Sequence, residues 1–189
     1  MVKKILLFVL LFFIIFPEAF AKTNAPFQVE LLQNGKASRS LRLSNGDLTM
    51  ELQPVEVKPA VNFPNRMLVI RNKSNPIDLE YVVGNHSVKE NVNIEEYQKI
   101  ERITFEVKLK NLTCKEEKDK IGFYDKQGKR RVYINRPYMK DMGDVNTDAV
   151  TYNLRKVGNQ LFVDLVPLDD WLKDRSRVFS VQVVLPVGF

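Results

Sequence analysis

The sequence is poor in the residues that most often build reactive centres. Its 189 residues include one cysteine, one histidine and one tryptophan. A single cysteine cannot form an internal disulfide, and Cys114 with His86 is too small a set for a Cys/His zinc site or a Cys–His nucleophile with any redundancy. Only Lys115 and Lys118 lie near Cys114 to activate it, so we expect the thiol to pack as a small apolar group. Much familiar enzymology is thereby excluded, and the sequence predicts no catalytic residue and no cofactor.

The overall composition is that of a folded protein. Hydrophobic residues make up 44% of the chain and charged residues 28%, with 29 Lys and Arg against 23 Asp and Glu. This balance is typical of a domain with a real core and excludes a disordered tail. The formal net charge of +6 is a modest excess of positive charge.

The N-terminal segment has the layout of a secretory signal peptide. Lys3 and Lys4 precede an unbroken apolar run of twelve residues, from Ile5 to Phe16, and Ala19-Phe20-Ala21 supplies a small-x-small cleavage site. A helix of that run spans only ~18 Å, too short for a hydrocarbon core of ~30 Å. We therefore expect residues 1–21 to be a signal peptide. The mature protein would be exported (secreted, periplasmic or attached to the cell surface) with no transmembrane segment after cleavage.

The rest of the chain is dominated by a period of two. From Ile103 to Leu109, apolar residues alternate with Thr104, Glu106 and Lys108, which is typical of a half-buried antiparallel strand. The same alternation occurs at residues 48–52, 79–83, 150–154, 161–165 and 179–185. The continuous apolar run at 67–70 is consistent with a strand buried on both faces.

Short turn signals separate these runs. Candidate turns are Asn34-Gly35, Asn45-Gly46, Asp125 to Gly128 and Gly158-Asn159. Helical signals are weak: residues 169–172 could form one turn with an aspartate as N-cap, and residues 94–100 are a poorer candidate. The sequence predicts an all-β fold, an antiparallel β-sandwich with at most one or two short helical turns. Residues 22–189 are expected to form a single β-sandwich domain, in which residues 22–66 are a possible N-terminal sub-piece.

Several segments resemble a bacterial protein family. They are Asp78-Leu79-Glu80-Tyr81, Val88-Lys89-Glu90-Asn91, Ile103 to Glu106, Phe123 to Gly128, Arg136 to Asp141, Asp170 to Asp174 and Arg177 to Val181. Their order over residues 65–183 resembles the β-rich module that precedes the repeats in bacterial cell-wall-associated and RHS (YD-repeat) proteins. This chain is expected to be a stand-alone, secreted copy of that module. The resemblance implies structural roles, with Trp171 and Leu172 as an apolar plug at one end of the sandwich, and it supplies no catalytic residue.

The densest group of basic residues lies around the predicted turn at 125–128. The candidate binding residues are Tyr124, Lys126, Lys129, Arg130, Arg131 and Tyr133. Cations interleaved with aromatic rings suit nucleic acids or anionic polymers. Since export is expected, we take an anionic polymer of the cell envelope as the more plausible partner and expect no nucleic acid.

The acidic residues give weaker signals. Asp141, Asp144, Asn146 and Asp148 fall within eight residues and are weak calcium candidates, but they lack the EF-hand spacing, so no metal site is predicted. Paired acids such as Glu95-Glu96 point to opposite faces of a strand and are poor glycosidase candidates. His86 is expected to be an exposed turn residue, because no nucleophile elbow accompanies it.

These observations favour a secreted, non-catalytic binding or interaction module of the bacterial surface, whose partner is an envelope polymer or a surface protein. One alternative is an accessory protein that pairs with a repeat-containing surface or toxin protein by strand addition. A less favoured alternative is a hydrolase that acts on envelope polymers. The oligomeric state cannot be read from the sequence.

Overall fold

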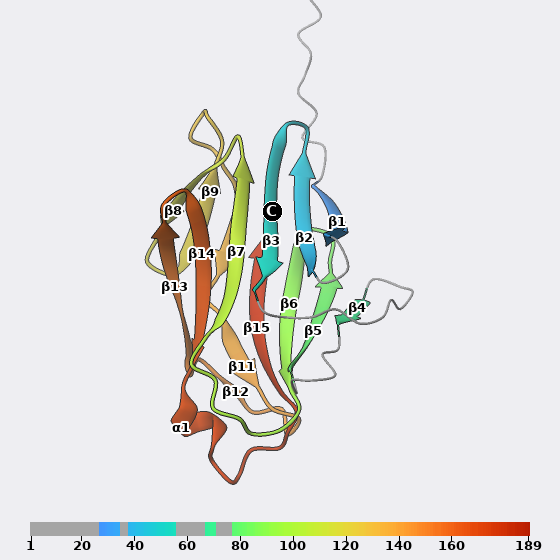
Figure 1. Ribbon diagram of the computed structural model, residues 1–189, viewed down its shortest axis with the longest axis vertical. Helices are drawn as coiled ribbons and strands as arrows, with labels where there is room; N and C mark the ends of the chain where they lie inside the picture. The colour runs from blue at the N-terminus through green and yellow to red at the C-terminus, as the bar shows by residue number, and fades with distance from the viewer. Residues whose placement is uncertain (1–26, 35–37, 56–66, 71–76) are drawn as a thin grey trace, which may run out of the picture.

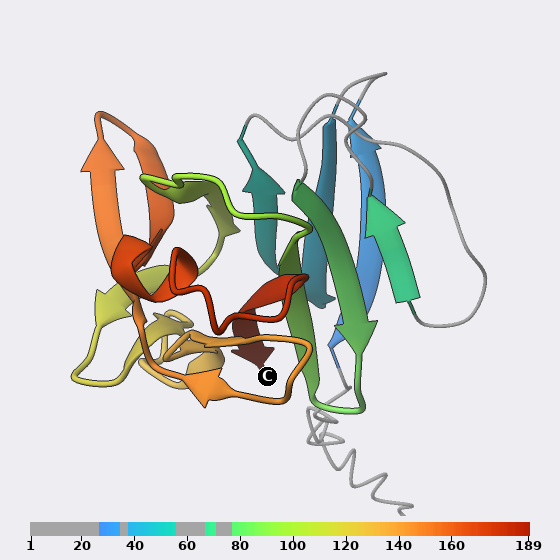
Figure 2. The ribbon, with the colours of Figure 1, turned by 90° about the horizontal axis from the view of Figure 1, so that it is seen from below.

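The computed structural model describes residues 27–34, 38–55, 67–70 and 77–189. Within these ranges the chain is almost entirely strand, arranged as two antiparallel sheets that lie one in front of the other (Figures 1 and 2). This confirms the predicted all-β sandwich. The predicted signal peptide at 1–21 and the turn at Asn34-Gly35 fall on or border residues outside the described part.

One sheet has six described strands. In spatial order they are β1 (Gln28–Asn34), β2 (Ser38–Asn45), β3 (Leu48–Pro54), β7 (Ile103–Lys110), β14 (Gln160–Pro167) and β13 (Val150–Val157). The strands β1 to β3 come from the predicted sub-piece 22–66, and β3 pairs with β7 over Thr49–Pro54. The N-terminal segment is therefore part of the same sheet as the later strands.

The other sheet has nine described strands. In order they are β4 (Met67–Ile70), β5 (Ile77–Val83), β6 (Ser87–Ile94), β15 (Val181–Gly188), β10 (Arg130–Asn135), β9 (Lys120–Tyr124) and β8 (Thr113–Glu116), with β11 (Tyr138–Lys140) pairing with β15 and β12 (Asn146–Thr147) pairing with β11. The apolar run at 67–70 is the strand β4, as predicted, but it lies at the edge of the described sheet. The burial of its side chains lies outside the described part.

The core lies between the two sheets and follows the alternation of the sequence. Phe105 and Val163 from the six-stranded sheet and Phe123 and Val183 from the nine-stranded sheet are fully buried in one apolar cluster. At ~25 cal/mol per Å² of apolar surface, each such side chain contributes about 1.5–3 kcal/mol by leaving water. The inward positions therefore fix both sheets and leave the alternate positions on the outer faces.

The helical predictions hold only in part. A short helix, α1 (Asp169–Leu172), forms where expected, at one end of the sandwich, and Leu172 is buried there while Trp171 is half-buried. The N-cap residue is Leu168, which makes no side-chain hydrogen bond, so the predicted aspartate cap is wrong. Asp169 and Asp170 instead lie in the first turn, where their negative charge interacts favourably with the helix dipole.

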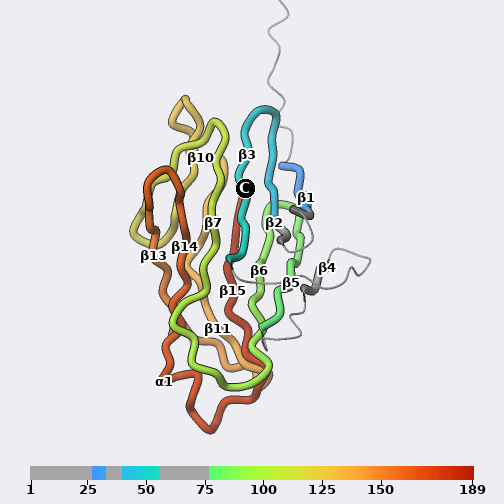
Figure 3. Tube along the Cα trace, in the orientation of Figure 1, coloured from blue at the N-terminus to red at the C-terminus, as the bar shows by residue number. Residues whose placement is uncertain are grey.

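The predicted helical turn at 94–100 is wrong. Ile94 ends β6, and the following residues cross the end of the sandwich near α1 to reach β7 in the other sheet (Figure 3). An extended chain advances more than 3 Å per residue and a helix only 1.5 Å, so a short link between two sheets is extended. Among the residues that the structure describes, no helix is both long enough and apolar enough to cross a membrane.

A buried hydrogen bond joins Tyr81 to the carboxyl group of Glu90, which lies opposite it, on β5 and β6 respectively. The Tyr81 hydroxyl donates a hydrogen bond of 2.6 Å to Glu90 Oε1, and Glu90 is fully buried. Burial raises the pKa of Glu90 to about 8, against the lowering effect of the Tyr81 hydrogen bond. Glu90 Oε2 has no hydrogen-bond partner among the described residues. The carboxyl is therefore held protonated at neutral pH.

A second buried carboxylate, Asp141, ties two segments together at the α1 end of the sandwich. Its Oδ1 accepts hydrogen bonds from the backbone N–H groups of Gly143 and Val145, both at 3.0 Å. Its Oδ2 accepts from Arg177 at 3.2 Å and from the N–H of Val178 at 3.4 Å. Burial acts to raise the pKa of Asp141, but the backbone hydrogen bonds and the Arg177 charge outweigh it and leave that pKa below its usual value. The loop after β11 is thereby joined to the segment before β15.

We expect the free energy of unfolding to fall as the pH rises from about 4.5 to about 8, because the folded state keeps the Glu90 proton that the unfolded state has released. The loss approaches ~1.4 kcal/mol per pH unit in that window. Replacing Glu90 by Gln keeps an acceptor for Tyr81 and removes the titration. Urea unfolding at pH 5, 7 and 9 should show a steep decline for the wild type and a shallower one for Glu90→Gln. Parallel slopes in the two proteins would show that Glu90 ionises normally.

Replacing Asp141 by Asn should lower the melting temperature by more than about 5 °C, because it leaves Arg177, whose side chain is only 12% exposed, without its counter-charge and sets an amide N–H against other donors. The exposed Asp144 in the same loop provides a matched control, and Asp144→Asn should change the melting temperature by no more than about 1 °C. Thermal unfolding followed by circular dichroism measures both. Equal effects of the two substitutions would contradict this role of Asp141.

Candidate functional site

The candidate binding residues of the sequence lie on the hairpin of β9 and β10. Tyr124 ends β9, Lys126 and Lys129 stand at the exposed tip, and Arg130 begins β10. The hairpin projects at the end of the sandwich opposite α1 (Figure 1). All six predicted residues are exposed or half-buried on this hairpin, and Arg131 differs from the others in being paired with Asp125.

Asp125 shapes the tip and takes Arg131 away from solvent. Its Oδ1 accepts hydrogen bonds from the backbone N–H groups of Gln127 at 3.0 Å and Lys129 at 2.9 Å. Arg131 binds Oδ2 at 3.4 Å, and its side chain is only 18% exposed. Gly128 has φ +74°, a backbone conformation that is strained for any residue with a Cβ atom. The turn is therefore fixed, and the Arg131 guanidinium is paired with Asp125 within it.

Tyr133 lies in a straight row across the outer face of the nine-stranded sheet. The pairing register places Lys115, Gly122, Tyr133 and Gly188 side by side on β8, β9, β10 and β15. A Cβ at Gly188 would overlap the Tyr133 ring, and one at Gly122 would overlap Tyr124. The two glycines thus leave room for both rings to lie against the sheet.

Two cations lie against the Tyr133 ring on this face. Lys120 Nζ is 5.6 Å and Arg130 Cζ is 5.3 Å from the centroid of Tyr133. Such cation–π contacts hold the charged groups near the ring while leaving them in water. We call the outer surface of β8 to β10 and its tip the basic–aromatic face. It comprises Lys115, Lys120, Tyr124, Lys126, Lys129, Arg130 and Tyr133.

One carboxylate, Glu117, also lies on this face. Tyr124 donates a hydrogen bond to its Oε1, and Arg130 lies 3.3 Å from its Oε2. The Tyr124 hydrogen bond and the nearby cations lower the pKa of Glu117, while burial acts the other way. Glu117 therefore stays ionised and organises Tyr124 and Arg130, and it neutralises only part of the positive charge of the face.

Sequence reasoning missed Lys115, Lys120 and the two glycines. Lys120, Gly122 and Tyr124 follow a period of two, which was available as a signal. Lys115 and Gly188 join them only through the pairing of four strands, which a single sequence does not specify.

The four weak calcium candidates do not form a cluster of ligands. Asp141 is buried and its oxygens accept N–H donors, whereas Asp144, Asn146 and Asp148 are exposed. Asp148 lies 3.7 Å from Arg136. In the part of the chain that the structure describes, no group of three or more His, Cys, Asp or Glu side chains is placed to hold a metal ion.

The two remaining candidates from the sequence, His86 and Cys114, are not placed in any group of potential metal ligands among the described residues. His86 is exposed in the turn between β5 and β6. Cys114 is half-buried on β8, and burial, with a smaller contribution from Glu116, raises the pKa of its thiol to about 11. A thiol with that pKa is protonated at neutral pH and is a poor nucleophile.

Comparison with curated proteins finds three relatives among the tRNA nucleases. The chain is 29% identical over 156 residues to the tRNA3(Ser)-specific nuclease WapA of Bacillus spizizenii, an alignment that covers 78% of this chain. It is 28% identical over 156 residues to the tRNA nuclease WapA of Bacillus subtilis, again over 78% of this chain. It is 32% identical over 115 residues to the tRNA(Glu)-specific nuclease WapA of Bacillus subtilis subsp. natto, over 57% of this chain.

The alignments cover a small part of each relative. The chain spans 7% of the length of the first two nucleases and 5% of the third. No family model matches the chain. No solved structure matches it either.

These relatives overturn the functional predictions made from the sequence. The matched proteins are named as tRNA nucleases, which are enzymes that act on nucleic acid. The prediction of a stand-alone, non-catalytic surface module, like the pre-repeat module of RHS proteins, is therefore wrong. So is the prediction of an envelope polymer or surface protein as partner to the exclusion of nucleic acid, and with it the alternatives of a pairing accessory protein and an envelope hydrolase. The error arose because partner chemistry was chosen from expected export, whereas cations and aromatic rings suit RNA equally well.

Proposed function

We propose that this chain is a nuclease-related protein that acts on tRNA, and that the basic–aromatic face is where it contacts the RNA. The names of the three relatives suggest the substrate class. The observation that carries the site is the arrangement of Lys120 and Arg130 around the Tyr133 ring, with Tyr124 beside them on the same outer face. Export through residues 1–21 remains a prediction that is compatible with this function.

The chemistry of the face matches that of single-stranded RNA segments. Lysine and arginine neutralise phosphates and make binding dependent on salt. Unpaired bases stack on tyrosine rings or on arginine planes, and each stacked base contributes about 1–3 kcal/mol. Arg130 lies against Tyr133, so a cation and a planar surface are presented together. A tRNA offers unpaired bases in its loops and at its 3′ end.

The tip and the strands contribute differently. Lys126 and Lys129 are exposed at the tip, beyond the last paired strand residues Tyr124 and Arg130, and can reach phosphates without a change in the fold. Tyr124 and Arg130 are held by Glu117, which fixes the orientation of both groups before RNA arrives. Preorganisation of this kind lowers the entropy cost of binding.

A charge reversal at the tip tests the proposal. We expect the full chain to bind fluorescently labelled tRNA and the double substitution Lys126→Glu, Lys129→Glu to weaken binding by at least about tenfold, because two phosphate contacts become repulsive. The slope of the logarithm of affinity against the logarithm of salt concentration should fall in magnitude by about 2. Fluorescence anisotropy between 50 and 200 mM salt measures both quantities, and denaturing gels of the same samples show whether the bound tRNA is cut.

The opposite sheet supplies a matched control. Lys110 on β7 and Lys156 on β13 are exposed, and Lys110→Glu with Lys156→Glu makes the same change in net charge. The affinity of this variant for tRNA should differ from that of the wild type by less than about twofold, because the change in net charge alone has only a small effect. Equal losses in the two double variants, or a wild type that does not bind tRNA at 50 mM salt, would refute the proposal.

A further inference from the structure

A pocket opens between the two sheets, on the inner side of the edge formed by β8 and the β8–β9 turn. It has a volume of about 280 Å³ and lies where β8 and β13, the last described strands of their sheets, face each other. Its lining residues come from the β8–β9 turn, the link between β10 and β11, and the start of β13. They are Glu116, Lys118, Asp119, Arg136, Pro137, Val150, Thr151 and Tyr152.

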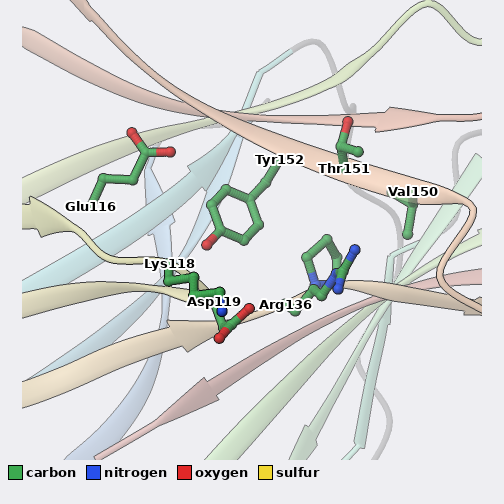
Figure 4. A pocket seen from close by; sticks show the side chains of 8 residues that line it. Glu116, Lys118, Asp119, Arg136, Val150, Thr151 and Tyr152 are labelled. Atoms are coloured by element: carbon green, nitrogen blue, oxygen red, sulfur yellow. The ribbon is translucent and has the colours of Figure 1, made fainter.

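The pocket has an apolar wall and an aromatic ring. Val150 and Pro137 are buried, and Tyr152 is half-buried with its ring packed against the core. Figure 4 shows the Tyr152 side chain with Glu116 to its left and Lys118 and Asp119 below it. A planar ligand can therefore lie against the ring while its polar groups meet charged side chains.

The charged groups of the pocket are of both signs and are exposed. Arg136 and Lys118 can bind an anion, and Glu116 and Asp119 can accept hydrogen bonds from hydroxyl groups. Arg136 lies 3.7 Å from Asp148, and the two side chains are 61% and 76% exposed. An exposed ion pair of this length is worth at most about 1 kcal/mol, so a phosphate can replace Asp148.

The hydroxyl of Tyr152 is available as a donor. Burial is the main cause that raises its pKa, and the charges of Glu116 and Asp119 raise it further. The hydroxyl is therefore protonated at neutral pH. It points toward Lys118 and Asp119 in Figure 4.

We propose that this pocket binds a single ribonucleotide, with the phosphate on Arg136 and Lys118, the base against Tyr152, and the ribose hydroxyls donating to Glu116 or Asp119. The choice of a ribonucleotide as ligand rests on the proposed function. The match between its phosphate, base and hydroxyl groups and the lining residues rests on the pocket itself. A 2′-hydroxyl is the group that distinguishes RNA from DNA at such a site. Two carboxylates beside an aromatic ring and two cations supply acceptors for that hydroxyl.

Isothermal titration calorimetry of the full chain with 5′-AMP, 5′-dAMP, adenosine and inorganic phosphate tests each part of the proposal. AMP should bind in the millimolar range and at least about fivefold more tightly than adenosine, because adenosine lacks the group that Arg136 and Lys118 bind. AMP should also bind about threefold or more tightly than dAMP, because dAMP lacks the 2′-hydroxyl that the carboxylates accept. Absence of AMP binding, or equal binding of AMP and adenosine, would overturn the assignment.

Variants locate the binding in the pocket. Arg136→Ala should abolish the difference between AMP and adenosine, and Arg175→Ala, at an exposed arginine outside the pocket, should leave it intact. Glu116→Gln should narrow the difference between AMP and dAMP, since a neutral amide accepts a hydroxyl hydrogen bond less strongly. Both pocket positions are exposed, so these variants are expected to fold; far-ultraviolet circular dichroism checks this. Equal loss in Arg136→Ala and Arg175→Ala would place the ligand elsewhere.

The test separates the two proposals. If the double variant Lys126→Glu, Lys129→Glu still binds AMP but no longer binds tRNA, both proposals are supported and the two sites are distinct. Binding of tRNA to the basic–aromatic face without any binding of AMP overturns the pocket and leaves the proposed function standing. Binding of AMP by a chain that does not bind tRNA overturns the proposed function and keeps the pocket as a nucleotide site.

Discussion

The fold depends on one constraint: apolar side chains at alternate positions of both sheets must meet between them. Phe123, Val132 and Ile134 are fully buried on the inner side of β9 and β10. Because successive side chains of a strand point to opposite faces, burial of these three forces Tyr124 and Tyr133 onto the outer face. The charged and aromatic surface is therefore a consequence of the core, and a shift of one residue in register would exchange the two.

The glycines at 122 and 188 set how the outer face is used. Tyrosine in a row with ordinary side chains stands away from the sheet, whereas opposite glycine it can lie over the backbone. The position of Tyr133 over the backbone brings its ring within reach of Lys120 on the neighbouring strand β9 and of Arg130 on its own strand β10. The absence of side chains at Gly122 and Gly188 thus allows the tyrosine rings and the neighbouring cations to form one continuous surface.

Period-two alternation was sufficient to predict the sandwich, because the burial of one face of each strand is a local property of the sequence. The turn at 125–128 was also predictable, since Asp125 and Gly128 have the turn chemistry that the structure uses. The crossing at 95–102 was not, because only the positions of β6 and β7 in different sheets make an extended link necessary. Within the candidate site, the dense basic run of the sequence marks the exposed tip, but the ion pair between Arg131 and Asp125 could not be read from it, because it depends on the folded turn.

The β8–β9 turn joins the two surfaces. It is closed by a hydrogen bond of 2.8 Å from the Glu117 N–H to the Lys120 carbonyl oxygen. Glu116, Lys118 and Asp119 face the pocket between the sheets, while Glu117 and Lys120 belong to the outer face. Neighbouring residues of one short turn therefore contribute to both, because the turn lies at the edge of the sheet, where the chain reverses and the inner and outer sides meet. An RNA strand that follows the outer face across β9 and β8 would reach the pocket by passing this edge, so the two proposed contacts lie on one path around the molecule.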